Sequence, residues 1–190
     1  IALLFLLTGI AYGIGSKRFK SDNDIVNNTI ECLKNVGGIV GYDTKTVNTL
    51  RLWEASSTNG FDLQLFNNME YIRAVERQNS AENVSRVLYP NDSGPSGKAL
   101  RLKQQYFFSS ASLQDLVNHF INDHGTDFQK FPDYQVIQLN DTHPVVAIPE
   151  LMRILMDEQG LGWDESWNIV KRTFAYTNHT ILAEALEKWP

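Results

Sequence analysis

The stretch LNDTHPVVAIPELMRIL, residues 139–155, decides how this chain is interpreted. An apolar run ends in Asn140, Asp141, Thr142 and His143, and a pattern typical of a helix follows. Two interpretations fit these polar residues. Asn, Asp and Thr favour turns and helix caps, and the local pattern taken alone favours that role. The alternative is a ligand site, because open α/β sheets bind their ligands beyond the carboxyl ends of the strands.

Helical periodicity follows this stretch and recurs elsewhere in the chain. Apolar residues recur with helical spacing over residues 113–121 and 148–156, which predicts a helix in each place. A third helix is predicted from Asp164 onward. Acidic residues begin it, and Lys171 and Arg172 come near its end, as the helix dipole favours.

Short apolar or alternating runs separate these helices and predict strands. The four runs are residues 46–53, 84–90, 134–140 and 174–179. Polar stretches rich in turn residues predict loops at residues 56–60, 91–98 and 122–132, and the second of these is interpreted as a mobile loop flanking a site. Because strands alternate with helices, the sequence predicts an α/β fold with a mostly parallel sheet and helices on both faces.

Three of the four predicted strands end in polar residues. Asp92 follows the second strand, Asp141 and His143 follow the third, and His179 ends the fourth. If these strands are parallel neighbours, the polar residues meet at one edge of the sheet. Carboxylates, amides and imidazoles suit a polyol, because they accept hydrogen bonds from hydroxyl groups or donate to them. A metal site is the weaker alternative, since the histidines lack HxxxH or HExxH spacing. A structural role for His179 also fits.

Composition excludes several classes of protein. The 190 residues carry a formal net charge of −5, which argues against a nucleic-acid surface. A single cysteine, Cys32, excludes an internal disulfide and favours a reducing, cytoplasmic location. The apolar residues 1–15 are shorter than the roughly 20 residues that a membrane span needs. They fit a signal-peptide core, a buried strand or a buried helix, and the missing initial Met suggests a piece of a longer protein.

Several aromatic and basic residues have two interpretations. Trp163 and Trp167 are interpreted as core or staple contacts rather than a sugar-stacking platform, and residues 106–108 are also assigned to the core. Lys98, Arg101 and Lys103 fit a solvated face or a phosphate contact, and the solvated face is preferred.

Longer motifs give the chain a family resemblance. They are, in order, GYDTK (41–45), TVNTLRLWEA (46–55), VLYPND (87–92), LRLKQQYF (100–107), QLNDTHP (138–144), AIPELMRIL (147–155), AYTNHT (175–180) and EALEKWP (184–190). Over about residues 39–190 the chain resembles the α-glucan (glycogen, starch and maltodextrin) phosphorylase family. Residues 1–38 do not resemble the corresponding family segment and are left unassigned.

The resemblance implies a fold and a reaction. The family has two Rossmann-like domains in a GT-B-type glycosyltransferase fold, and residues 39–190 resemble part of the N-terminal one. Such enzymes cleave terminal α-1,4-linked glucosyl units with inorganic phosphate and release glucose 1-phosphate, using pyridoxal phosphate. Full-length members are expected to be homodimers in the cytoplasm, with a glucan and phosphate as partners and with neither nucleic acid nor membrane.

The resemblance also implies roles for individual residues. His179 matches the histidine that contacts the 6-hydroxyl of the reacting glucosyl unit. Asp141 and His143 match residues that line the glucan side of the cleft. Asp92 matches the acidic residue of the loop that gates the site. These are positioning and electrostatic roles rather than bond-making ones.

Other positions match less directly or depart from the family. Arg101 and Glu187 match residues further out around the same pocket. The family's cofactor lysine lies in the C-terminal domain and matches no lysine here, so no catalytic residue is assigned and this chain alone is expected to be inactive. Asn118 and His119 replace an arginine pair that binds phosphorylated effectors in animal enzymes. Allosteric control of that kind is therefore not expected, which suits a constitutive enzyme of bacterial or plant type.

Two other functions remain open at this stage. The chain fits a non-catalytic glucan-binding or interaction module derived from a phosphorylase. It also fits a sugar-nucleotide glycosyltransferase of similar fold, which the motifs disfavour.

Overall fold

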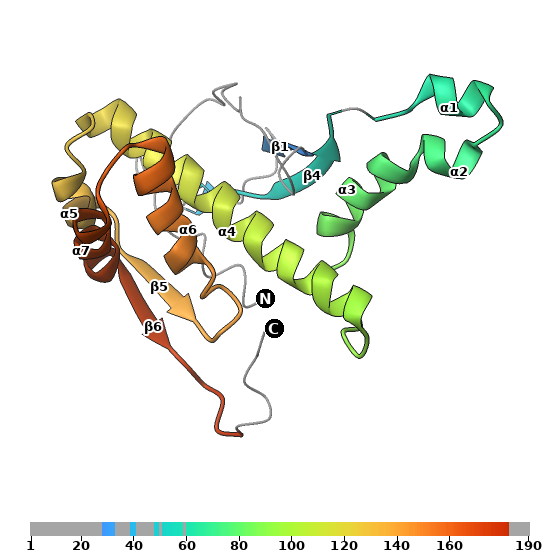
Figure 1. The fold of residues 1–190 in the computed structure, drawn as a ribbon. Helices are drawn as coiled ribbons and strands as arrows, with labels where there is room; N and C mark the ends of the chain where they lie inside the picture. Colours follow the sequence, from blue (N-terminus) through green and yellow to red (C-terminus); the bar gives the residue numbers. More distant parts are fainter. Residues whose placement is uncertain (1–27, 33–38, 41–47, 50, 59, 183–190) are drawn as a thin grey trace. The chain divides into compact units, whose positions relative to one another are not determined.

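The structure is a computed structural model that describes residues 28–32, 39–40, 48–49, 51–58 and 60–182. The described residues form two compact units. The sheet unit contains residues 39–40, 48–49 and 108–182, and the hairpin unit contains residues 28–32, 51–58 and 60–107. Helix α4 (Pro95–His124) contributes residues to both units. Figure 1 shows the elements coloured along the chain.

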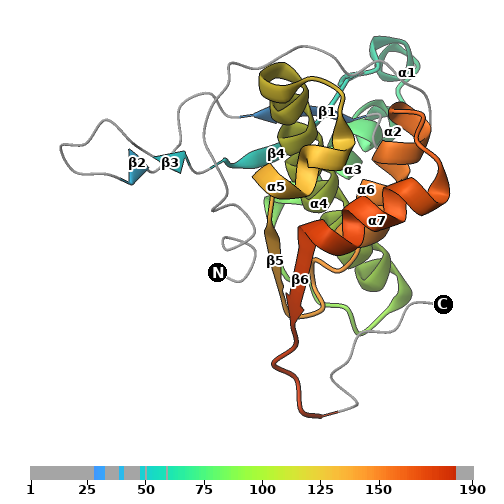
Figure 2. The same cartoon turned by 90° about the vertical axis from the view of Figure 1, so that its left-hand side faces the viewer.

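The sheet unit is organised around two parallel strands, β5 (Ile137–Asn140) and β6 (Phe174–Thr177). Their register pairs Ile137 with Phe174 and Asn140 with Thr177. The crossover between them contains α6 (Ala147–Arg153), a π-helical turn (Ile154–Glu158) and α7 (Trp163–Thr173), as parallel pairing requires a long connection. Figures 1 and 2 show both strands side by side and pointing the same way, so their carboxyl ends lie together.

The core of the sheet unit lies where α4, α6 and α7 pack with β5. Fully buried side chains include Phe120, Leu139, Leu151 and Ile169. The helix predicted at residues 113–121 is confirmed, because its apolar face supplies part of this core. Gly125 ends α4 with a φ of +76°, a conformation that glycine adopts without steric cost. Short elements complete this unit: a 3-10 turn (Phe128–Lys130), α5 (Phe131–Tyr134) and the antiparallel pair β2 (Ile39–Val40) and β3 (Asn48–Thr49).

A buried carboxylate joins α4 to α6 inside the sheet unit. The Glu150 side chain is 2% exposed, and its Oε1 accepts a hydrogen bond from the Ser110 hydroxyl at 2.6 Å. Arg153 donates to both oxygens of this carboxylate, from Nε at 2.8 Å and from Nη2 at 2.9 Å. Gln114 donates in turn to the Ser110 hydroxyl oxygen. The network satisfies a charge that would otherwise be costly to bury.

The hairpin unit pairs β1 (Asn28–Cys32) with β4 (Trp53–Ser57) in antiparallel register. Helix α3 (Glu76–Arg86) packs on β4, and the backbone N–H of Ala55 donates to the Ser85 hydroxyl oxygen at 3.0 Å. Two short helices, α1 (Leu63–Asn67) and α2 (Tyr71–Ala74), precede α3. Small buried residues such as Ala55, Ala81 and Val84 allow helix and strand to approach closely.

The strand predicted at residues 84–90 is wrong. Helix α3 continues to Arg86, and residues 87–90 are irregular. The β-branched run is overridden because Ala81 and Val84 are buried on one helical face. Side-chain pairs four residues apart, including Arg86 with Glu82, add support to the exposed face.

The loop predicted at residues 91–98 is also wrong in its second half. Helix α4 begins at Pro95, where proline is pre-organised for a first helical position. Gly97 fits this first turn tightly, since a Cβ there would lie 1.9 Å from the backbone oxygen of Asn91. The predicted loop at residues 122–132 is likewise partly helical, because the 3-10 turn and α5 begin within it.

Other boundaries differ from the predicted ones by a few residues. Within residues 134–140 the strand begins at Ile137, and within residues 174–179 it ends at Thr177. Residues 46–53 contain β3 and the first residue of β4 rather than one strand. The helices predicted at residues 148–156 and from Asp164 are confirmed, the first ending in the π-helical turn.

The observed fold is a mixture of helices and strands with a small parallel sheet, consistent with the α/β prediction. Besides the parallel pair, the described residues contain two antiparallel pairs. Trp163 and Trp167 are 63% and 46% exposed, so the core interpretation is wrong, and a staple contact stays a prediction. Residues 1–15 and Glu187 lie outside the described residues. Within the described part of the chain, no helix has the length and apolar character needed to cross a membrane.

Candidate functional site

The candidate site lies at the carboxyl ends of β5 and β6. The backbone N–H of Asp141 donates to the carbonyl oxygen of Thr177 at 2.7 Å, which continues the strand pairing by one residue. Gln138 adds a side-chain bond, because its Nε2 donates to the Thr177 hydroxyl oxygen at 3.0 Å. These bonds hold together the two polar segments that follow the strands, as the prediction of parallel neighbours required.

His179 and Asn140 form the closest side-chain contact between these segments. The Nε2 atom of His179 lies 2.7 Å from Oδ1 of Asn140. His179 is exposed and Asn140 is half-buried, so the amide anchors a ring that solvent and ligands can reach. The contact makes His179 part of an ordered polar group rather than an isolated strand-end residue.

Asp141 has an uncommon backbone conformation with a φ of +65°. Aspartate tolerates this left-handed region better than most residues because its short side chain can bond to nearby backbone. Its Oδ1 accepts from the Thr142 N–H at 2.9 Å and from the Thr180 hydroxyl at 3.3 Å. The carboxylate therefore caps its own turn and also contacts the segment after β6. The turn role that the local pattern favoured is therefore confirmed at this residue, and its role as a ligand site stays a prediction.

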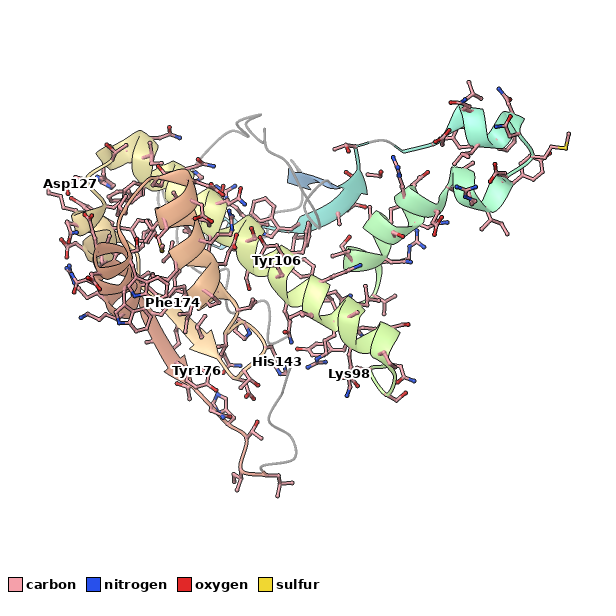
Figure 3. The ribbon with its side chains drawn as sticks, in the orientation of Figure 1. Lys98, Tyr106, Asp127, His143, Phe174 and Tyr176 are labelled. Carbon is pink, nitrogen blue, oxygen red and sulfur yellow. The ribbon has the colours of Figure 1, made fainter. Side chains whose placement is uncertain are left out.

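His143 lies in the turn between β5 and α6, at residues 141–146, and is half-buried. Figure 3 shows it in this turn, with Phe174 and Tyr176 along β6. Asp141, His143 and His179 thus come from the two segments that follow the parallel strands. Their convergence was predicted from the positions of the strand ends.

Asp92 and Arg101 belong to the hairpin unit. The expected link of Asp92 to a strand end is wrong, because residues 84–90 form no strand. The structure does bring these two residues together. Arg101 Nε lies 3.9 Å from Asp92 Oδ2, and the guanidinium carbon lies 5.4 Å from the ring centroid of Tyr89. With Asp92 more than half exposed, such an ion pair is weak.

Comparison with known proteins decides the family. A family model described as "Carbohydrate phosphorylase" matches residues 16–190, which extends further towards the amino end than the resemblance over residues 39–190. The chain belongs to the carbohydrate phosphorylase family. It is 55% identical over 159 residues to the brain form of glycogen phosphorylase from Homo sapiens, and 54% identical to the human liver form. It is 55% identical to the liver form from Ovis aries.

Each of these alignments covers 80% of this chain and 19% of the relative. The chain therefore spans about one fifth of the length of the curated phosphorylases that it matches. These relatives are animal proteins, and the expectation of a bacterial or plant type stays a prediction. In this phosphorylase segment His119 lies on α4, with its Nδ1 2.8 Å from the backbone oxygen of Asp115 and 3.4 Å from its carboxylate.

Three residues of this candidate site were not assigned from sequence. Asn140, Thr180 and Gln138 hold His179, Asp141 and the end of β6 through side-chain bonds. Asn140 and Thr180 are neighbours of the assigned residues in LNDTH and TNHT. The sequence showed that both are polar, but it did not show which side chains they contact. The signal was the polar character of both strand ends, which predicts mutual contacts once the strands are known to be neighbours.

The chemistry of this edge fits hydroxyl-bearing ligands. It offers carboxylate and amide oxygens as acceptors, and hydroxyl groups and imidazole rings that also donate. Among the described residues no group of three or more His, Cys, Asp and Glu is placed to bind a metal ion. The residues from 137 to 146 and from 174 to 182 include no lysine, so the edge does not fit pyridoxal phosphate, which needs a lysine amine for its Schiff base.

Proposed function

We propose that this chain is a segment of an α-1,4-glucan phosphorylase and that it contributes the glucan-binding side of the active-site cleft. The enzyme transfers terminal glucosyl units of glycogen, starch or maltodextrin to inorganic phosphate and releases glucose 1-phosphate. The observation that carries the proposal is the polar edge at the ends of β5 and β6, in a chain 55% identical to glycogen phosphorylases.

Each residue of the edge has a proposed task. His179 contacts a hydroxyl of the reacting glucosyl unit, and its ring is presented by Asn140 at 2.7 Å. Asp141 and His143 bind hydroxyl groups on the glucan side. The left-handed turn at Asp141 and its contact with Thr180 fix this carboxylate before the ligand arrives. Such preorganisation lowers the cost of binding.

Asp92 and Arg101 lie in the hairpin unit, and each is proposed to have the role that the family resemblance implies. Asp92, in the segment between α3 and α4, is assigned to the gate of the cleft. Arg101 is assigned to the outer pocket together with Glu187.

The cofactor and assembly follow from the same proposal. Pyridoxal phosphate supplies the acid–base chemistry of the family and is held by a part of the enzyme other than this segment. The whole enzyme is proposed to have the two-domain GT-B-type fold and to act in the cytoplasm as a homodimer. Allosteric control by nucleotide phosphates is not expected, because Asn118 and His119 replace the arginine pair.

The test measures glucose 1-phosphate release from maltodextrin and inorganic phosphate by the full-length protein that contains this chain. We expect phosphate-dependent release, and we expect His179→Ala to lower kcat/KM by about tenfold, the value of one hydrogen bond to a substrate hydroxyl. The isolated 190-residue chain is expected to release none.

A matched control is His124→Ala. His124 ends α4 in the same unit and stacks on Tyr134, with ring centroids 3.8 Å apart, away from the strand ends. We expect this variant to keep kcat/KM. An equal loss in both variants would refute the assignment of His179. Glucan binding without release by the full-length protein would favour a non-catalytic module, and transfer from a sugar nucleotide would favour a glycosyltransferase.

A further inference from the structure

The contact between His179 and Asn140 fixes the chemistry of the imidazole ring. Nε2 lies 2.7 Å from the amide oxygen Oδ1, which has lone pairs and no proton. A hydrogen bond at this distance therefore requires the proton to reside on Nε2. In the neutral ring the other nitrogen, Nδ1, then carries a lone pair and accepts hydrogen bonds.

Strand pairing holds the backbone of Asn140 independently of the contact with His179. It is the last residue of β5, and its register partner on β6 is Thr177. At the next residue, the N–H of Asp141 donates to the Thr177 carbonyl oxygen at 2.7 Å. The side-chain bond from Gln138 to Thr177 fixes the same strand end at 3.0 Å. Strand pairing thus places the backbone of Asn140 at the end of β5, and its amide oxygen contacts His179 in the segment after β6.

The arrangement leaves Nδ1 as the nitrogen that a ligand meets. His179 is exposed, and among the described residues no second hydrogen-bond partner of its ring is recorded. An Nδ1 lone pair accepts from a hydroxyl and repels an ether, carbonyl or fluorine, which carry lone pairs but no proton. The ring therefore selects a ligand group by the direction of its hydrogen bond.

We propose that Asn140 is a positioning residue that holds His179 in the Nε2–H tautomer, so that Nδ1 accepts a proton-donating hydroxyl of the glucosyl unit. This inference rests on the proposed function for the identity of the ligand. The tautomer itself depends on the contact between His179 and Asn140 and not on the identity of the ligand.

The first test is independent of any glucan. The chain has four histidines, so ¹⁵N-labelled imidazoles give a small set of resolvable signals. At a pH where the rings are neutral, we expect His179 to show a protonated Nε2 and an unprotonated Nδ1. Asn140→Ala should give a mixture of both tautomers. Asn140→Asp should keep the Nε2–H form, because a carboxylate oxygen also accepts.

The control for this test is Asn168→Ala on α7, which removes an amide elsewhere in the same unit and should leave the His179 signals unchanged. A protonated Nδ1 in the unaltered chain would overturn the proposal. An unchanged tautomer in Asn140→Ala would overturn it as well. Either result leaves the phosphorylase assignment untouched.

The second test uses the full-length protein and the maltodextrin assay. We expect Asn140→Ala to lower kcat/KM by about three- to tenfold, and Asn140→Asp to retain more activity than Asn140→Ala. Equal losses in these two variants would show that the amide acts through packing and not through the tautomer. A full-length protein with no phosphate-dependent release would refute the proposed function, while the tautomer result would still stand.

Discussion

Replacing Glu150 by alanine tests whether the buried network between α4 and α6 stabilises the sheet unit. The carboxylate is 2% exposed and receives one bond from Ser110 and two from Arg153. Its removal leaves the proton of the buried Ser110 hydroxyl without an acceptor, because Gln114 can only donate to that oxygen through its Nε2. A buried group left unsatisfied costs about 1–3 kcal/mol.

The contribution of Arg153 is smaller than its two bonds suggest. Its side chain is 37% exposed and also donates to Glu158 at 2.8 Å, so water and Glu158 compensate part of the loss. The free energy lost with the packing of the Glu150 side chain adds to the cost of leaving the Ser110 hydroxyl without an acceptor. We therefore expect Glu150→Ala to lower the free energy of unfolding by about 3–4 kcal/mol, within the range for breaking a buried ion pair.

Urea unfolding of the chain, followed by far-ultraviolet circular dichroism, measures this change from the midpoint at constant m-value. Glu150→Gln is the matched variant, because it keeps the shape and one acceptor oxygen for Ser110 but removes the charge. It should cost about 1–2 kcal/mol. A loss below about 1 kcal/mol for Glu150→Ala, or equal losses for both variants, would refute this reasoning.

Four further changes test other parts of the structure by simpler measurements. Ser166→Ala should raise the free energy of unfolding by roughly 0.5–1 kcal/mol, because its fully buried hydroxyl has no hydrogen-bond partner among the described residues; destabilisation in a urea melt would contradict this. Asp141→Val should cost about 1–2 kcal/mol more than Asp141→Asn, since a β-branched residue resists the positive φ; equal midpoints would show that the turn relaxes. Gly97→Ala should cost roughly 1–3 kcal/mol through the close backbone oxygen, and an unchanged melting temperature would place that contact further away. A hydrogen bond and the charge of Asp127 raise the pKa of Lys130, so Asp127→Asn should lower that pKa in an NMR titration of the ammonium group, and an unchanged midpoint would exclude the pair in solution.

Long periodic patterns predicted the helices well. The apolar face at residues 113–121 and the charge order of α7 depend on neighbours three or four positions apart, which the sequence displays directly. The strand predicted at residues 84–90 is wrong because its first residues belong to helix α3, which begins at Glu76. Local propensity was outweighed by burial of Ala81 and Val84 against β4.

The site was predictable in its position but not in its contacts. Strand-end placement of Asp141, His143 and His179 followed from the alternation of strands and helices. The bond from His179 to Asn140 required the register of β5 and β6, which joins residues 39 positions apart. The exposure of Trp163 and Trp167 was also beyond the sequence, because nothing local distinguishes a tryptophan that covers a core from one at its margin.

The long crossover between β5 and β6 has a consequence for when the site exists. Helices α4, α6 and α7 are built from contacts between near neighbours, which form early and at low entropic cost. The bonds that define the polar edge each close a loop of 39 residues, so they depend on the whole crossover being packed. A partly folded chain that keeps its helices lacks the edge altogether. Any ligand held there would thus bind the completed unit alone, and its binding energy would stabilise the long-range pairing of β5 with β6.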